Sequence, residues 1–169
     1  EDDVHQILAK VPGVYARDEE GFGLRPNIGL RGASAERSAK VTLLEDGILV
    51  GPAPYAAPAA YFFPLTTRMT QVEVFKGPSA VGYGPQTIGG AVNMISRTTP
   101  REGSLAKLDL AYGSFSAMKG HIALGHRSGA FSSLLEGVHL RADGFKTFSD
   151  GSPAGGFEKN EWLMKLGWG

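Results

Sequence analysis

The last part of the chain alternates apolar and charged side chains with a period of two, and this pattern restricts the fold more than any other feature. Across residues 105–112, 117–127, 132–145 and 159–169, most even positions are apolar and most odd positions are charged or polar. Successive side chains of a strand point to opposite faces, so the pattern predicts four antiparallel strands. Grouping all even positions places Leu110, Leu124, Val138 and Trp162 on one apolar face.

Two kinds of protein produce such strands. Outer-membrane barrels use segments of about 9–11 residues, short turns on one side and longer loops on the other. The connections here follow that rule, with a short link at residues 113–116, a tight turn at Ser128-Gly129 and a long polar loop at 146–157. Tyr112, Trp162 and Trp168 suit an aromatic girdle. A soluble antiparallel sheet with one face on a core explains the parity equally well, and four strands alone cannot close a barrel.

Residues 1–100 follow a different rule, so we expect two domains that divide at Pro100. Asp2 or Asp3 can cap a short helix over residues 4–11, and Asp46-Gly47 between two apolar segments is a strong hairpin signal. Residues 47–67 carry no charge, but Pro52, Pro54, Pro58 and Pro64 exclude a membrane-spanning helix there. The first domain is therefore predicted to be a compact mixed α/β unit.

Composition and motifs exclude several functions. The chain has 24 glycines and 10 prolines in 169 residues, which favours turns and strands. Seventeen basic residues balance seventeen acidic ones, so no nucleic-acid partner is expected. There is no cysteine, and the four histidines lack metal-ligand spacing. Residues 77–84 have phosphate-loop glycines without the required lysine, and no catalytic serine elbow or carboxylate pair is present. We therefore expect neither an enzyme nor a metal site.

Six motifs occur in a fixed order between residues 11 and 93. They are Val11-Pro12-Gly13-Val14, Asn27-Ile-Gly-Leu-Arg31-Gly32, Leu44-Glu-Asp46-Gly47-Ile48, Val72-Glu-Val-Phe-Lys76-Gly77-Pro78, Tyr83-Gly84 and Ile88-Gly89-Gly90-Ala-Val-Asn93. Their order and spacing resemble the plug domain of TonB-dependent outer-membrane receptors, and the ferric-citrate or ferric-siderophore type in particular. The strands after Pro100 fall where that family begins its plugged barrel of about 22 strands.

The resemblance implies an α+β plug domain of mixed short strands and helices over residues 1–100. The first antiparallel strands of a transmembrane β-barrel would follow over residues 101–169. It implies a receptor in the outer membrane of a Gram-negative bacterium that binds a ferric chelate and imports it with energy from TonB. The TonB-pairing segment would precede Glu1, the lipid would contact the barrel, and iron would be cargo rather than a cofactor. The charges expected on the lumen side are Lys107, Asp109, Lys119, Arg141 and Lys165.

The resemblance also assigns ligand-contacting loops to residues 17–25 and 52–61, with residues 33–39 alongside them. The candidate ligand-binding residues are Glu20, Phe22, Arg25, Arg37, Tyr55 and Tyr61. Tyrosines offer a flat apolar face with a hydroxyl, and arginines complement an anionic chelate. Ala56-Ala57 follow Tyr55 where ferric-citrate receptors often carry a polar residue, so the pattern leaves the identity of the chelate open.

Two other functional classes remain open on the sequence alone. A soluble periplasmic β-rich binding module accounts for the turns and strands without a membrane. A non-energised outer-membrane channel or adhesin accounts for the alternating strands without TonB.

Overall fold

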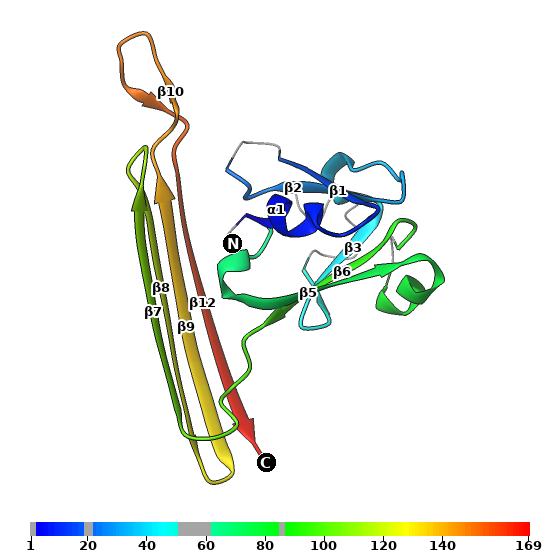
Figure 1. Cartoon of the computed structure of the whole chain (residues 1–169), viewed down its shortest axis with the longest axis vertical. Coiled ribbons are helices and arrows are strands. Elements are labelled where there is room, and N and C mark those ends of the chain that lie inside the picture. The colour runs from blue at the N-terminus through cyan, green and yellow to red at the C-terminus, as the bar shows by residue number, and fades with distance from the viewer. Residues whose placement is uncertain (1–2, 19–21, 51–61, 85–86) are drawn as a thin grey trace. The chain divides into compact units, whose positions relative to one another are not determined.

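A computed structural model describes residues 3–18, 22–50, 62–84 and 87–169. The chain divides into two compact units, Glu1–Arg97 (unit 1) and Thr98–Gly169 (unit 2). Figure 1 shows short elements in unit 1 and long strands in unit 2. The elements of unit 1 are α1 Val4–Ala9, β1 Val14–Asp18, β2 Pro26–Leu30, η1 Glu36–Ser38, β3 Val41–Glu45, β4 Ile48–Leu49, η2 Thr66–Arg68, β5 Met69–Lys76, η3 Gly77–Tyr83 and β6 Gly90–Ser96.

Helix α1 begins at the predicted acidic cap. The Asp3 side chain accepts a hydrogen bond of 2.8 Å from the backbone N–H of His5, which satisfies one of the free donors at the helix start. Val4 and Leu8 lie one turn apart, and both are buried in the same core as Ile28 and Leu30 of β2. The antiparallel pair β1–β2 thus shares its core with the helix.

A four-stranded mixed sheet forms the rest of unit 1, in the order β4-β3-β6-β5. The predicted hairpin β3–β4 is confirmed, and Asp46 and Gly47 have the positive φ angles of 49° and 81° that a type I′ turn requires. β3 runs parallel to β6, and Asn93 of β6 accepts a hydrogen bond of 3.0 Å from the Gly47 N–H. Arg68 forms a two-pronged ion pair with Glu45, which ties the end of η2 to β3.

Unit 2 contains the four predicted long strands and one small hairpin. They are β7 Ser104–Gly113, β8 Ala117–Ser128, β9 Phe131–Ala142, β10 Lys146–Thr147, β11 Pro153–Ala154 and β12 Phe157–Trp168. The long strands pair antiparallel in the order β12-β9-β8-β7, and β10 pairs with β11. Among the described residues, no helix reaches the length and hydropathy of a membrane-spanning segment.

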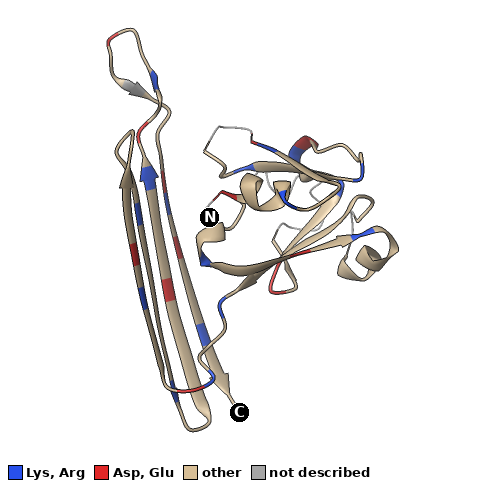
Figure 2. Ribbon diagram, in the orientation of Figure 1, with Lys and Arg blue, Asp and Glu red and all other residues tan. Residues whose placement is uncertain are grey.

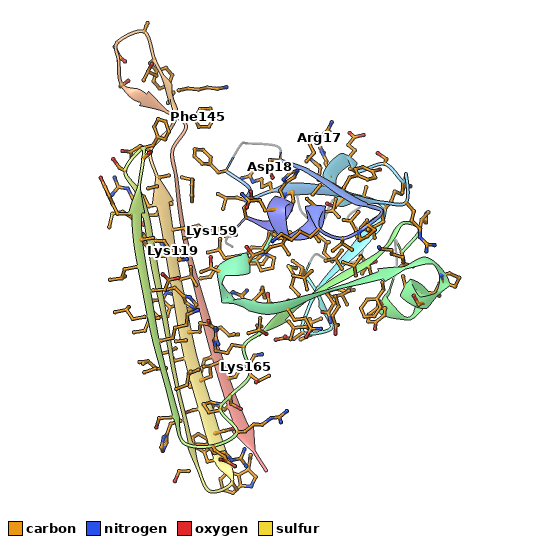
Figure 3. All side chains as sticks on the ribbon, viewed as in Figure 1. Arg17, Asp18, Lys119, Phe145, Lys159 and Lys165 are labelled. Atoms are coloured by element: carbon orange, nitrogen blue, oxygen red, sulfur yellow. The ribbon has the colours of Figure 1, made fainter. Side chains whose placement is uncertain are left out.

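The two faces of the four-stranded sheet differ in chemistry. The exposed large side chains of the apolar face are Leu108, Leu110, Tyr112, Ile122, Leu124, Leu135, Trp162, Met164, Leu166 and Trp168. The polar face carries Lys107, Asp109, Lys119, His121, Glu136, Lys159, Glu161 and Lys165. Figure 2 shows the charges recurring along the strands, and Figure 3 labels Lys119, Lys159 and Lys165. Lys119 forms an ion pair with Asp109 at 2.8 Å, and Nε2 of His121 shares a hydrogen bond with Oε1 of Glu136 at 2.6 Å.

The prediction that even positions lie on the apolar face is wrong for β9. Ser128 pairs with Phe131 across a two-residue turn, so an even position of β8 shares a face with an odd position of β9. Val138 is therefore on the polar face opposite His121, whereas Arg141 is opposite Met118 on the apolar face. The pairing of Ala142 with Phe157 reverses the parity once more, so β12 follows the predicted pattern.

Candidate binding site

The hairpin β1–β2 and the segment of residues 33–38 enclose a cleft of about 540 Å³ in unit 1. Its lining among the described residues consists of Tyr15, Arg17, Asn27, Ser34, Ala35, Glu36 and Arg37. Tyr15 and Arg17 lie two positions apart on β1 and so point to the same face of the strand. The remaining lining residues come from β2 and from the segment that follows it, so the cleft is assembled from three pieces of chain.

Tyr15 holds one wall of the cleft through an unusually close approach to β2. Its cross-strand partner is Gly29, and a Cβ on Gly29 would lie only 2.3 Å from the Tyr15 ring. The absence of a side chain on Gly29 therefore lets the ring lie across the β2 backbone. From there the Tyr15 hydroxyl donates a hydrogen bond to the carbonyl oxygen of Ala33, which fixes the start of segment 33–38.

Asn27 and Ser38 hold the other end of that segment. The Arg37 N–H donates to Oδ1 of Asn27 at 2.5 Å, and the hydroxyl of Ser38 donates to the Pro26 carbonyl at 3.0 Å. The Ser38 oxygen also accepts the Ile28 N–H at 2.9 Å. These bonds support an unfavourable backbone, since Arg37 and Ser38 have φ angles of 50° and 55° in the left-handed region. The segment is thus kept in one conformation by side chains of β2 and of the segment itself.

The charges around the cleft are separated by strand alternation. Arg17 lines the cleft, and its neighbour Asp18 points to the opposite side of β1, because successive side chains of a strand alternate between its faces. Burial raises the pKa of the Asp18 carboxyl above its usual value, the Asp3 carboxylate raises it further, and His5 opposes both effects. The acidic neighbour is therefore held away from the two guanidinium groups of the cleft.

The sequence-predicted site residues have different outcomes. Arg37 lines the cleft, as does Arg17 from the predicted loop of residues 17–25. Arg25 is exposed and Phe22 half-buried, and neither belongs to the described lining. Glu20, Tyr55 and Tyr61 lie outside the described residues, so their assignment stays a prediction.

Sequence reasoning missed Tyr15 and Asn27, and it included Ser34 and Glu36 only as part of the flanking segment of residues 33–39. One signal was available for Tyr15, because a tyrosine opposite a glycine in a hairpin often lies across it. No local signal marks Asn27, because its role depends on a segment ten residues later folding back onto β2.

Unit 1 matches a known protein family. The family model of the TonB-dependent Receptor Plug Domain covers residues 1–91. The chain belongs to this family. The plug-domain resemblance of the sequence motifs is thereby confirmed, and the match covers nearly all of unit 1.

Individual relatives are transporters and receptors. The vitamin B12 transporter BtuB of Photobacterium profundum is 25% identical over 178 residues, covering 96% of this chain and 28% of the relative. The structure of the ferric citrate transporter FecA superposes with a TM-score of 0.77 at 24% identity, over 99% of this chain and 26% of FecA. The ferric yersiniabactin receptor FyuA of Yersinia pestis gives 0.75 at 20% identity, over 96% of this chain and 25% of FyuA. The chain therefore spans about a quarter of the length of these proteins.

Proposed function

We propose that this chain is the plug and the first wall strands of an outer-membrane receptor that binds a ferric chelate and imports it with energy from TonB. The observation that carries the proposal is the combination of a plug-domain fold with a sheet whose two faces differ in polarity. The plug family supports energised uptake, and the ferric-citrate and ferric-yersiniabactin receptors support iron as the cargo. In this proposal the cleft of unit 1 contributes the plug's share of the ligand site.

The strands of unit 2 support the membrane part of the proposal. The four long strands contain 10, 12, 12 and 12 residues, which is enough for a tilted strand to cross a bilayer. The apolar face carries Leu108, Trp162 and Met164 at 67%, 71% and 67% exposure, and lipid would remove these side chains from water. The polar face would then line the interior of the barrel.

The apolar face argues against one of the alternatives that the sequence leaves open, and the plug domain argues against the other. A soluble periplasmic module would leave a contiguous row of leucine, methionine and tryptophan side chains in water, where such patches associate. A passive channel or adhesin has no need of a plug, whereas the plug domain is the part of this chain that the family model matches.

The test is uptake of radioactive iron by cells that carry the full-length receptor under iron limitation. We expect accumulation of a supplied ferric chelate that stops when TonB is deleted or the proton gradient is collapsed. Deleting residues 1–97 while keeping the barrel should also abolish energised uptake. Accumulation that is unchanged without TonB would contradict the proposal and favour a passive channel.

A further inference from the structure

We infer that the cleft between β1–β2 and residues 33–38 binds the carboxylate groups of an anionic, oxygen-rich chelate through Arg17 and Arg37. This inference rests on the proposed function, because it specifies the chemical class of the cargo at the plug. Its ligand class is a hydroxycarboxylate complex of iron, rather than a cationic chelate.

The charge of the cleft is the first argument. Arg17 and Arg37 are both exposed side chains of the lining, and Glu36 is the one carboxylate among its described residues. Among the ion pairs between described residues, none involves Arg17 or Arg37. Guanidinium groups bind carboxylates through two parallel N–H···O bonds. Two such groups against one acidic side chain leave a positive excess that an anion would offset.

The hydrogen-bonding capacity of the cleft points the same way. Ser34 accepts the Glu36 N–H at 3.3 Å, so its own O–H remains a donor for a ligand. Asn27 uses its carbonyl oxygen for the Arg37 N–H, and its amide group adds two further donors. The lining is therefore richer in donors than in acceptors, which suits a ligand made mostly of carboxylate and hydroxyl oxygens.

The backbone conformation, the volume and the aromatic content of the cleft are the third argument. Arg37 stands in a left-handed backbone conformation that Asn27 and Ser38 support, and such strain collects at ligand-binding positions. The volume of about 540 Å³ lies within the range of small-molecule sites, which is about 300–1,000 Å³. Tyr15 is the single aromatic residue of the described lining, and its ring is already placed against Gly29.

The experiment measures binding to the purified full-length receptor in detergent, with ferric citrate as the carboxylate probe and ferrioxamine B as a cationic hydroxamate probe. Equilibrium dialysis with radioactive iron gives the dissociation constant of each. We expect ferric citrate to bind, more weakly as salt increases, and ferrioxamine B not to bind. Each of Arg17→Gln and Arg37→Gln should weaken ferric citrate binding about tenfold.

The matched control is the double variant Lys40→Gln/Arg101→Gln, which removes two positive charges from exposed residues outside the cleft. It should bind ferric citrate as the wild type does. Arg17→Lys/Arg37→Lys keeps the charge but loses the planar fork, and we expect an intermediate affinity. An intermediate affinity of the lysine variant would show that the arginines contact the ligand. The weaker binding of the glutamine variants would then not be due to a loss of assembled receptor.

Three results would overturn the inference. They are undiminished ferric citrate binding by Arg17→Gln/Arg37→Gln, equal weakening by the control pair, and preference for ferrioxamine B or binding of neither probe. TonB-dependent iron uptake that persists with a different chelate would leave the proposed function standing while the inference fails. If ferric citrate still bound at the arginines but its uptake no longer depended on TonB, the proposed function would fail and the inference would stand.

Discussion

Units 1 and 2 place their apolar side chains in opposite environments. Among the described residues of unit 1, ten buried apolar residues from α1, β1, β2, β3, β6 and the segment before η2 form one core, which includes Leu8, Ile28 and Leu43. In unit 2, the large side chains of the apolar face stand exposed in rows, and Trp168 is 83% exposed. The first unit thus gains stability by removing apolar surface from water within itself, whereas the second needs an apolar partner to do so.

An aromatic ring across a glycine occurs in both units and shows the same contrast locally. Tyr15 covers Gly29 in unit 1, and in unit 2 Trp162 covers its cross-strand partner Gly137, where a Cβ would lie 2.5 Å from the ring. In unit 1 the ring supports a polar cleft through its hydroxyl. In unit 2 the ring adds to the apolar face. The same packing of an aromatic ring over a glycine therefore occurs beside a polar cleft in one unit and on an exposed apolar face in the other.

The largest expected effect tests the core of unit 1. Leu43 is 1% exposed, so Leu43→Ala should destabilise this unit by about 2–5 kcal/mol through lost burial and the remaining cavity. The measurement is urea unfolding of residues 1–97. Ile48→Ala is the control, because Ile48 is exposed and its truncation should change stability by less than about 0.5 kcal/mol. Equal losses in both variants would show that unit 1 has no separate core.

The next effect tests the apolar face of unit 2. Met164→Arg puts a charge on this face and should cost about 2–4 kcal/mol if the face meets the middle of a membrane. Leu163→Arg is the matched control, because Leu163 pairs with Glu136 on the polar face. We expect the first variant to lower the amount of heat-modifiable receptor in the outer membrane far more than the second. Equal tolerance would remove the distinction between the faces.

A smaller effect tests the ring across Gly29. Gly29→Ala would place a Cβ against the Tyr15 ring, so the ring must move, at a cost of about 1–3 kcal/mol. The displaced hydroxyl would release Ala33 and loosen the cleft. Gly82→Ala is the control, because a Cβ there meets nothing within 4 Å. Thermal unfolding of residues 1–97 gives the stability, and unchanged melting of Gly29→Ala would show that the ring does not constrain the wall.

The smallest effect concerns pH. Because burial and Asp3 raise the pKa of Asp18 in the folded state, the folded state binds the proton more tightly than the unfolded state does. The stability of unit 1 should therefore fall as the pH rises above the usual carboxyl pKa of 3.8. Asp18→Asn removes this loss, so the variant should be slightly more stable than wild type at neutral pH. The difference should vanish below pH 3.8, and melting temperatures across this pH range measure it.

Sequence patterns predicted much of this fold because its signals are local. The Asp3 cap, the Asp46-Gly47 turn and the four long strands each depend on neighbouring residues. The parity error in β9 arose because a two-residue turn pairs position i with i+3, so even and odd positions must exchange faces. Counting along the sequence without counting across the turn placed Val138 and Arg141 on the wrong faces.

The site was less predictable because its parts meet only in three dimensions. Arg37 was predicted from a resemblance and from its charge, and it lines the cleft, whereas Asn27 was treated as an ordinary strand residue. The hydrogen bond that Asn27 accepts depends on the left-handed backbone at Arg37 and Ser38, and no residue type in this segment predicts that conformation. Glycine would have marked such a turn, but here an arginine and a serine occupy it.

The left-handed segment at Arg37 and Ser38 has a kinetic consequence. Hydrogen bonds to Asn27 and Pro26 arrange this loop during folding, before any ligand arrives. In the proposed binding step a ligand has little backbone ordering to impose, so its capture at the cleft should be a single fast step limited by encounter. Differences in affinity among related ligands should then appear in how long each one remains bound, while their association rates stay close together.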